Sequence, residues 1–94
     1  MTNKLLPHET ELTGNWIKEG VRVRGDAVCD RIKWLVTQHL LKVSVTGGGW
    51  ETLYQDPEDS RFWEHTYPYS EMHGGGPPQL KVLAPEQAKI KYRI

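Results

Sequence analysis

The sequence predicts an α+β domain, in which one main amphipathic helix packs on a twisted antiparallel sheet and a short helix ends the chain. Two patterns predict it. Apolar side chains recur at helical spacing between residues 28 and 40, and short segments with strand character, separated by turns, lie on both sides of this stretch. With 94 residues, the chain fits a single domain over residues 1–94, with a flexible N-terminal segment at residues 1–10.

The first half predicts a hairpin followed by the main helix. Trp16-Ile17 and Val21-Arg22-Val23 flank Gly20, which suits the positive φ of a tight turn. Gly25-Asp26 can cap the helix. Trp34 falls on the polar side of this helix. Either a neighbouring segment covers its ring, or the ring is exposed and anchors a partner. The apolar stripe, with Cys29 and Leu40 at its edge, comprises Val28, Ile32, Leu35, Val36 and His39.

The second half predicts strands, a loop and the last helix. Leu41–Thr46 alternates as a half-buried strand does, and Gly47–Gly49 reads as a flexible link. The acidic turn 56–60 joins two further strands into a hairpin, on which Trp63, His65 and Tyr67 share one face. The remaining segments are strands at Trp50–Tyr54, Arg61–Tyr67 and Gln79–Leu83, a loop at Pro68–Pro78, and a helix at Pro85–Tyr92 that begins with proline.

Charge is balanced over the whole chain, with 12 basic and 12 acidic residues, but it is unevenly distributed. Residues 50–72 hold one basic residue, Arg61, and six acidic ones: Glu51, Asp56, Glu58, Asp59, Glu64 and Glu71. Phosphate binding needs clustered cations, so this segment argues against a nucleic-acid ligand. It indicates a basic protein partner, or nothing beyond solubility.

Composition also indicates the cellular compartment of the protein. The mean hydropathy is -0.63, and no apolar run is long enough for a membrane span or a secretory leader. The single cysteine, Cys29, excludes an intramolecular disulfide and fits a reducing compartment. We therefore expect a cytoplasmic protein that binds no membrane, with Cys29 as a small core residue.

No catalytic or metal-binding motif stands out. The four histidines have no close helical ligand spacing, so no zinc site or other cofactor is expected, and His39 is interpreted as a buried or boundary residue with a satisfied ring. Glu51 and Glu64 could face each other across the hairpin, as a glycosidase pair does. A chain with a surface of about 5,500 Å² has little room for a deep cleft around such a pair, so we expect no enzyme.

Several motifs resemble bacterial immunity proteins of polymorphic and contact-dependent toxin systems, and most closely the immunity protein 27 family. They are Thr13–Trp16, Val28–Leu35, Gly49–Tyr54, Asp56-Pro57, Arg61–Glu64, Thr66–Pro68 and Ser70–Pro78. The resemblance implies a non-enzymatic antidote that binds a cognate secreted toxin domain. Such toxins are often nucleases with basic active surfaces, which an acidic, aromatic segment would occlude.

We expect the partner-binding residues to lie in the acidic middle segment and the loop that follows it. The carboxylates supply an electrostatic face, whereas the aromatic residues and His73 supply anchors. The alternative function is a small cytosolic protein-binding module without a toxin. The oligomeric state is open, with a monomer favoured. The predicted partner-binding residues are Glu51, Tyr54, Asp56, Glu58, Asp59, Trp63, Glu64, Tyr69, Glu71 and His73.

Overall fold

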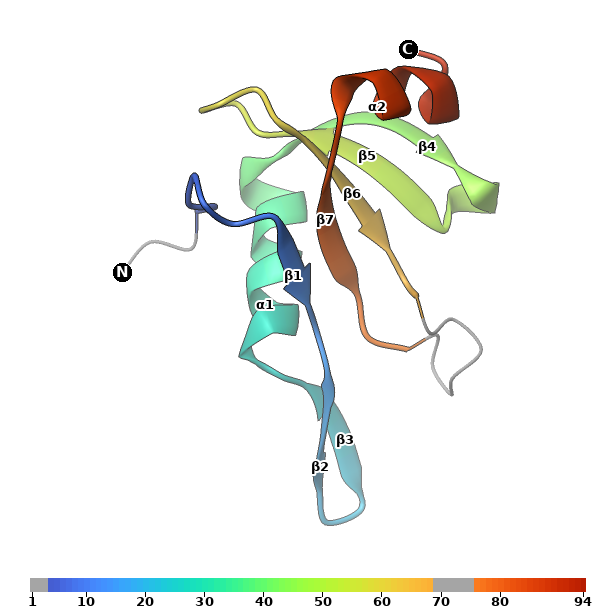
Figure 1. Ribbon diagram of the computed structural model, residues 1–94. Helices are drawn as coiled ribbons and strands as arrows, with labels where there is room; N and C mark the ends of the chain where they lie inside the picture. Colours follow the sequence, from blue (N-terminus) through green and yellow to red (C-terminus); the bar gives the residue numbers. More distant parts are fainter. Residues whose placement is uncertain (1–3, 69–75) are drawn as a thin grey trace.

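The fold is a five-stranded antiparallel sheet with a helix on each face and a separate two-stranded hairpin (Figure 1). The computed structural model describes residues 4–68 and 76–94. Its strand order is β1-β7-β6-β5-β4, with β2 and β3 paired outside it. The elements are β1 (Glu11–Thr13), β2 (Trp16–Glu19), β3 (Arg22–Gly25), α1 (Ala27–Trp34), the π-helical turn η1 (Leu35–His39), β4 (Leu41–Thr46), the 3-10 turn η2 (Gly47–Gly49), β5 (Glu51–Gln55), β6 (Phe62–Thr66), β7 (Gln79–Leu83) and α2 (Pro85–Tyr92).

The predicted α+β class is confirmed, with one main helical segment over residues 27–39 and a short C-terminal helix. The predicted hairpins are confirmed as β2–β3 and β5–β6. Gly20 has a φ of 62° at the first turn, as expected. The Asp26 side chain caps α1 by accepting from the Cys29 amide at 2.9 Å.

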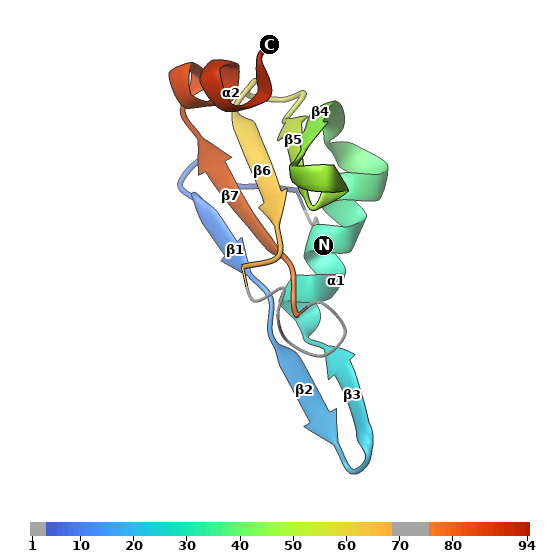
Figure 2. The ribbon, with the colours of Figure 1, turned by 90° about the vertical axis from the view of Figure 1, so that its right-hand side faces the viewer.

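Two apolar clusters lie on opposite faces of the sheet, because successive strand residues point to opposite sides. The larger cluster lies on the α1 side, where Ile32 and Leu35 of the helical segment pack against Trp63, Tyr54 and Leu80 of the sheet. On the other face, α2 places Ala88 and Tyr92 against Leu53. Figure 2 shows the two helices on different sides of the strands, with the β2–β3 hairpin projecting away from α2.

The link between β4 and β5, for which the sequence predicts flexibility, is a tight 3-10 turn. Gly48 and Gly49 have φ values of 68° and 96°, which residues with a side chain rarely adopt. The glycines therefore allow the chain to reverse within three residues.

Residues 4–10 form no helix or strand but pack closely on the domain. Leu5 is 7% exposed and belongs to the larger cluster. The Arg61 guanidinium donates to the carbonyls of Glu9 at 2.6 Å and Leu6 at 3.1 Å. Hydrophobic periodicity could not predict this segment, because its contacts are made with distant residues. Among the residues that the structure describes, no helix combines the length and apolar character needed to cross a bilayer.

Candidate functional site

The predicted acidic residues lie in two separate places, not on one continuous face. Glu51 and Glu64 point to the α2 side of the sheet, where Lys91 binds both. The other described carboxylates, Asp56, Glu58 and Asp59, lie in the turn between β5 and β6. Glu71 lies outside the described residues.

Lys91 and Tyr92 bind the carboxylate pair on the α2 side. Lys91 Nζ lies 2.9 Å from Glu51 Oε2 and also binds Glu64, and the Tyr92 hydroxyl donates to Glu64 Oε2 at 2.7 Å. Burial lowers the pKa of Lys91, but its bonds to Glu51 and Glu64 raise that pKa above its usual range. Burial and the Glu64 carboxylate both raise the pKa of Tyr92. The Glu51–Glu64 pair, which the sequence allowed as a glycosidase-like pair, thus fastens α2 to the sheet.

A groove lies beside this pair and is bordered by the most exposed aromatic ring among the described residues. It has a volume of about 440 Å³, and its lining includes Trp50, Glu51, Glu64 and Tyr67. The Trp50 side chain is 55% exposed and meets Tyr67 edge-on, with ring centroids 5.6 Å apart. Glu51 is 35% exposed. The groove therefore joins an accessible indole to a carboxylate that solvent can reach.

The β5–β6 turn is held by hydrogen bonds around Asp56, which is 1% exposed. Its amide donates to the Arg61 carbonyl at 2.9 Å, and its carbonyl accepts from the Ser60 amide at 2.8 Å. Its side chain accepts from the Glu58 amide at 2.8 Å. Asp59 bonds the Arg61 guanidinium at 2.6 Å. The turn is thus rigid, and Asp56 supports it from within instead of facing a partner.

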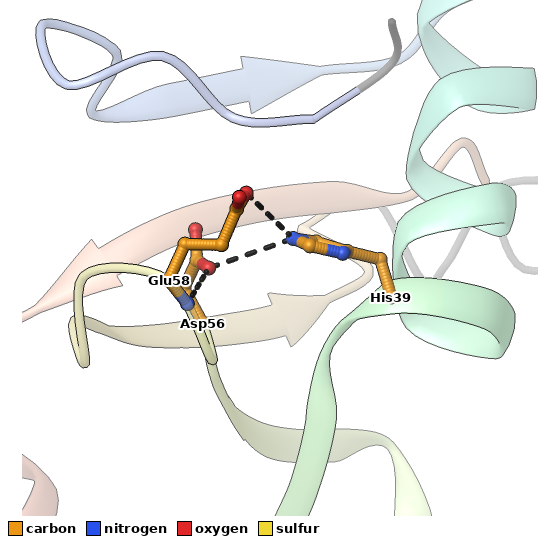
Figure 3. Close-up of side chains that lie close together, drawn as sticks. All are labelled: His39, Asp56 and Glu58. Carbon is orange, nitrogen blue, oxygen red and sulfur yellow. Dashed lines mark hydrogen bonds and ion pairs between the residues drawn. The ribbon is translucent and has the colours of Figure 1, made fainter.

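The same turn meets the end of the helical segment at His39 (Figure 3). His39 Nε2 lies 3.5 Å from Asp56 Oδ1 and 3.6 Å from Glu58 Oε2. The imidazole stacks on Trp34, with centroids 5.6 Å apart and planes 12° apart. Within the described part of the chain, the buried Nε2 has no hydrogen-bond partner. The boundary position predicted for His39 is confirmed, but the expectation of a satisfied ring is wrong.

The two predicted aromatic anchors that the structure describes, Tyr54 and Trp63, lie elsewhere than expected. Trp63 is 0% exposed and Tyr54 is 9% exposed, so both rings fill the core beneath α1 instead of facing outward. Tyr69 and His73 lie outside the described residues. Trp34 is partly buried against the core, as the covered alternative predicted. Sequence reasoning did not select Trp50, although its position directly after three glycines is a signal for a ring at the sheet margin.

The fold and these two sites can now be compared with known proteins. No curated protein and no solved structure matches the chain. The model of the family described as Immunity protein 27 matches residues 18–84, which contain α1 and strands β4 to β7. The match covers more than half of the 94 residues and includes both the groove and the β5–β6 turn. The chain therefore belongs to the immunity protein 27 family.

Proposed function

We propose that this protein binds a cognate toxin domain in the cytoplasm and neutralises it as a stoichiometric inhibitor, without catalysing a reaction. Membership of an immunity protein family supports the antidote role. The carboxylate pair most suited to acid–base chemistry is occupied by Lys91 and Tyr92, which supports a role in binding only. We propose that a monomer of this chain forms the complex.

The observation that carries the proposal is the groove beside Trp50. Interface hot spots are enriched in tryptophan and tyrosine, and an indole that is 55% exposed costs free energy in water unless a partner covers it. Lys91 binds Glu51 Oε2 and Lys81 also lines the groove, so the attraction for a cation is confined to the exposed side of Glu51, next to the apolar contact that Trp50 offers.

A nuclease toxin fits this requirement, because its active surface carries lysine and arginine side chains that bind phosphate. We propose that such a surface is occluded here. An interface of standard size buries about 800 Å² on each partner. The chain has 6282 Å² of accessible surface, so one such interface takes a modest share of it. Glu58 and Asp59, with side chains 53% and 37% exposed, are the further carboxylates that the toxin surface could meet.

The test uses the toxin domain that we expect to be encoded next to this gene. Co-expression should rescue growth, and the purified proteins should form a complex. Trp50→Ala should weaken that complex by about 30-fold or more, as the loss of a hot-spot tryptophan does. Glu51→Gln should reduce the association rate and its salt dependence.

The matched control is Trp16→Ala, because Trp16 is the other exposed tryptophan, 36% exposed, and lies on the projecting β2–β3 hairpin. It should change affinity less than threefold. Circular dichroism checks that each variant is folded. Wild-type affinity in Trp50→Ala, with that variant folded, would refute the groove as the binding site. Failure of the wild-type pair to bind would refute the toxin-neutralising role.

A further inference from the structure

Three potential metal ligands converge where the helical segment ends against the β5–β6 turn. His39 Nε2, Asp56 Oδ1 and Glu58 Oε2 lie within 4.8 Å of one another. Figure 3 shows the imidazole pointing toward both carboxylates. The nitrogen lies 3.5 Å and 3.6 Å from the two oxygens, beyond the usual hydrogen-bond range. A direct hydrogen bond therefore does not account for the arrangement.

The separations are close to those that a bound metal ion imposes. Zinc binds imidazole nitrogen and carboxylate oxygen at about 2.0–2.2 Å, so neighbouring ligands of a tetrahedral ion are about 3.4 Å apart. Both distances from His39 Nε2 agree with that spacing. The Glu58 side chain is 53% exposed, so its carboxylate can turn to complete the geometry.

Burial supplies an independent argument. The His39 side chain is 10% exposed, and its Nε2 is buried without a hydrogen-bond partner among the described residues. A buried polar atom without a hydrogen bond is uncommon and destabilising. The Asp56 side chain is 2% exposed and directed at the same nitrogen. A cation between them would give the nitrogen a partner and bind both carboxylates.

The surroundings also orient the ligands. Trp34 stacks on the imidazole, and the Glu58 amide donates to Asp56 Oδ1 at 2.8 Å, as outer-shell groups do in metal sites. Lys4 Nζ lies 3.3 Å from the other Glu58 oxygen, and its positive charge opposes a second cation. The two carboxylates outweigh the single Lys4 charge, so we expect moderate affinity.

We propose that His39, Asp56 and Glu58 form a binding site for a divalent transition-metal ion, with zinc as the ion that this nitrogen-and-carboxylate set suits. Three protein ligands leave one tetrahedral position open to water or to a side chain of a bound protein. The ion would link the end of η1 to the β5–β6 turn.

The test is titration of the chelator-treated full chain with Zn²⁺, followed by calorimetry. We expect one ion per chain with a micromolar dissociation constant. Glu58→Gln and His39→Gln should each weaken binding at least tenfold. Zinc should raise the melting temperature of the wild-type protein but not of His39→Gln. Because Glu58 is exposed, Glu58→Gln remains informative if His39→Gln fails to fold.

The controls are His8→Gln and Glu11→Gln, which remove the same chemical groups at exposed positions outside the cluster. Both should bind zinc as the wild type does. Two results would overturn the proposal: no binding below millimolar zinc, or equal binding in wild type and Glu58→Gln. The measurement needs no toxin, so its outcome is separate from that of the Trp50 experiment.

Discussion

The ion pair between Glu9 and Arg31 allows a stability prediction with a defined magnitude. Arg31 Nη1 and Nη2 donate to the two Glu9 oxygens at 2.7 Å and 2.6 Å, and the Leu6 amide donates to the same carboxylate at 2.7 Å. The Glu9 side chain is 16% exposed. The Arg31 hydrogen bonds lower the pKa of Glu9 from 4.5 to about 2, against the opposing effect of burial. This pair fastens the N-terminal segment to α1.

We expect Glu9→Gln to destabilise the fold at neutral pH. A fall in pKa from 4.5 to about 2 corresponds to about 3 kcal/mol of favourable interaction of the ionised group. Solvent screening of this partly exposed pair reduces the expected loss to about 2 kcal/mol. In a domain of this size, that loss should lower the melting temperature on the order of 10 °C. Urea unfolding measures the loss of free energy and thermal unfolding measures the melting temperature, both followed by circular dichroism.

The pH dependence has a definite sign. The pKa of Glu9 is depressed in the folded state, so its stabilisation is full above the unfolded value of 4.5 and disappears as the pH falls toward 2. Wild type and Glu9→Gln should therefore differ most at pH 7 and converge near pH 2. Glu11→Gln is the control, because the Glu11 carboxylate accepts a hydrogen bond from the nearby Thr13 hydroxyl and, within residues 4–68 and 76–94, does not pair with a basic side chain. A constant difference between wild type and Glu9→Gln across this range would refute the reasoning.

Three further predictions concern the packing of the domain. Tyr92→Phe removes the hydroxyl that bonds Glu64 and should cost about 2 kcal/mol in urea unfolding, whereas an unchanged midpoint would contradict that bond. Gly14→Ala should cost about 1–3 kcal/mol by the same assay, because a Cβ there would lie 2.5 Å from Cys29 Sγ and 3.0 Å from the Pro78 carbonyl. The Cys29 thiol, which is buried and has a raised pKa, should react with a thiol reagent only after unfolding; rapid reaction of the native protein would contradict its burial.

Local patterns were sufficient to predict most of the fold. The last strand and the last helix were predicted with the bounds that the structure has, Gln79–Leu83 and Pro85–Tyr92. Proline at the start of a helix and strand alternation are properties of neighbouring residues, so they can be read without tertiary information. The same holds for the Asp26 cap and the Gly20 turn.

The functional sites were harder to predict because they depend on which distant segments meet. The alternation of side chains along a strand places Trp63 and Glu64 on opposite faces of the sheet, but it does not reveal that α1 covers the face of Trp63. The charge count of the middle segment likewise omitted Lys91, which reaches Glu51 and Glu64 from the last helix. The acidic residues of one sequence segment therefore lie at two separate places in the fold, and basic side chains pair with them at each place.

The motifs that carry the family resemblance illustrate a division between structure and recognition. Gly14 lies against Cys29, whose thiol donates to the Asn15 carbonyl at 3.5 Å, and the Asp26 amide donates to that same carbonyl at 3.0 Å. These residues build the junction between β1, the projecting hairpin and α1, where the buried Gly14 and Cys29 offer a partner little surface. A toxin can contact only exposed atoms. Specificity for a particular toxin should therefore reside at exposed positions outside the shared motifs, such as Lys81 at the groove, and exchanging that position between family members should alter toxin choice without altering the fold.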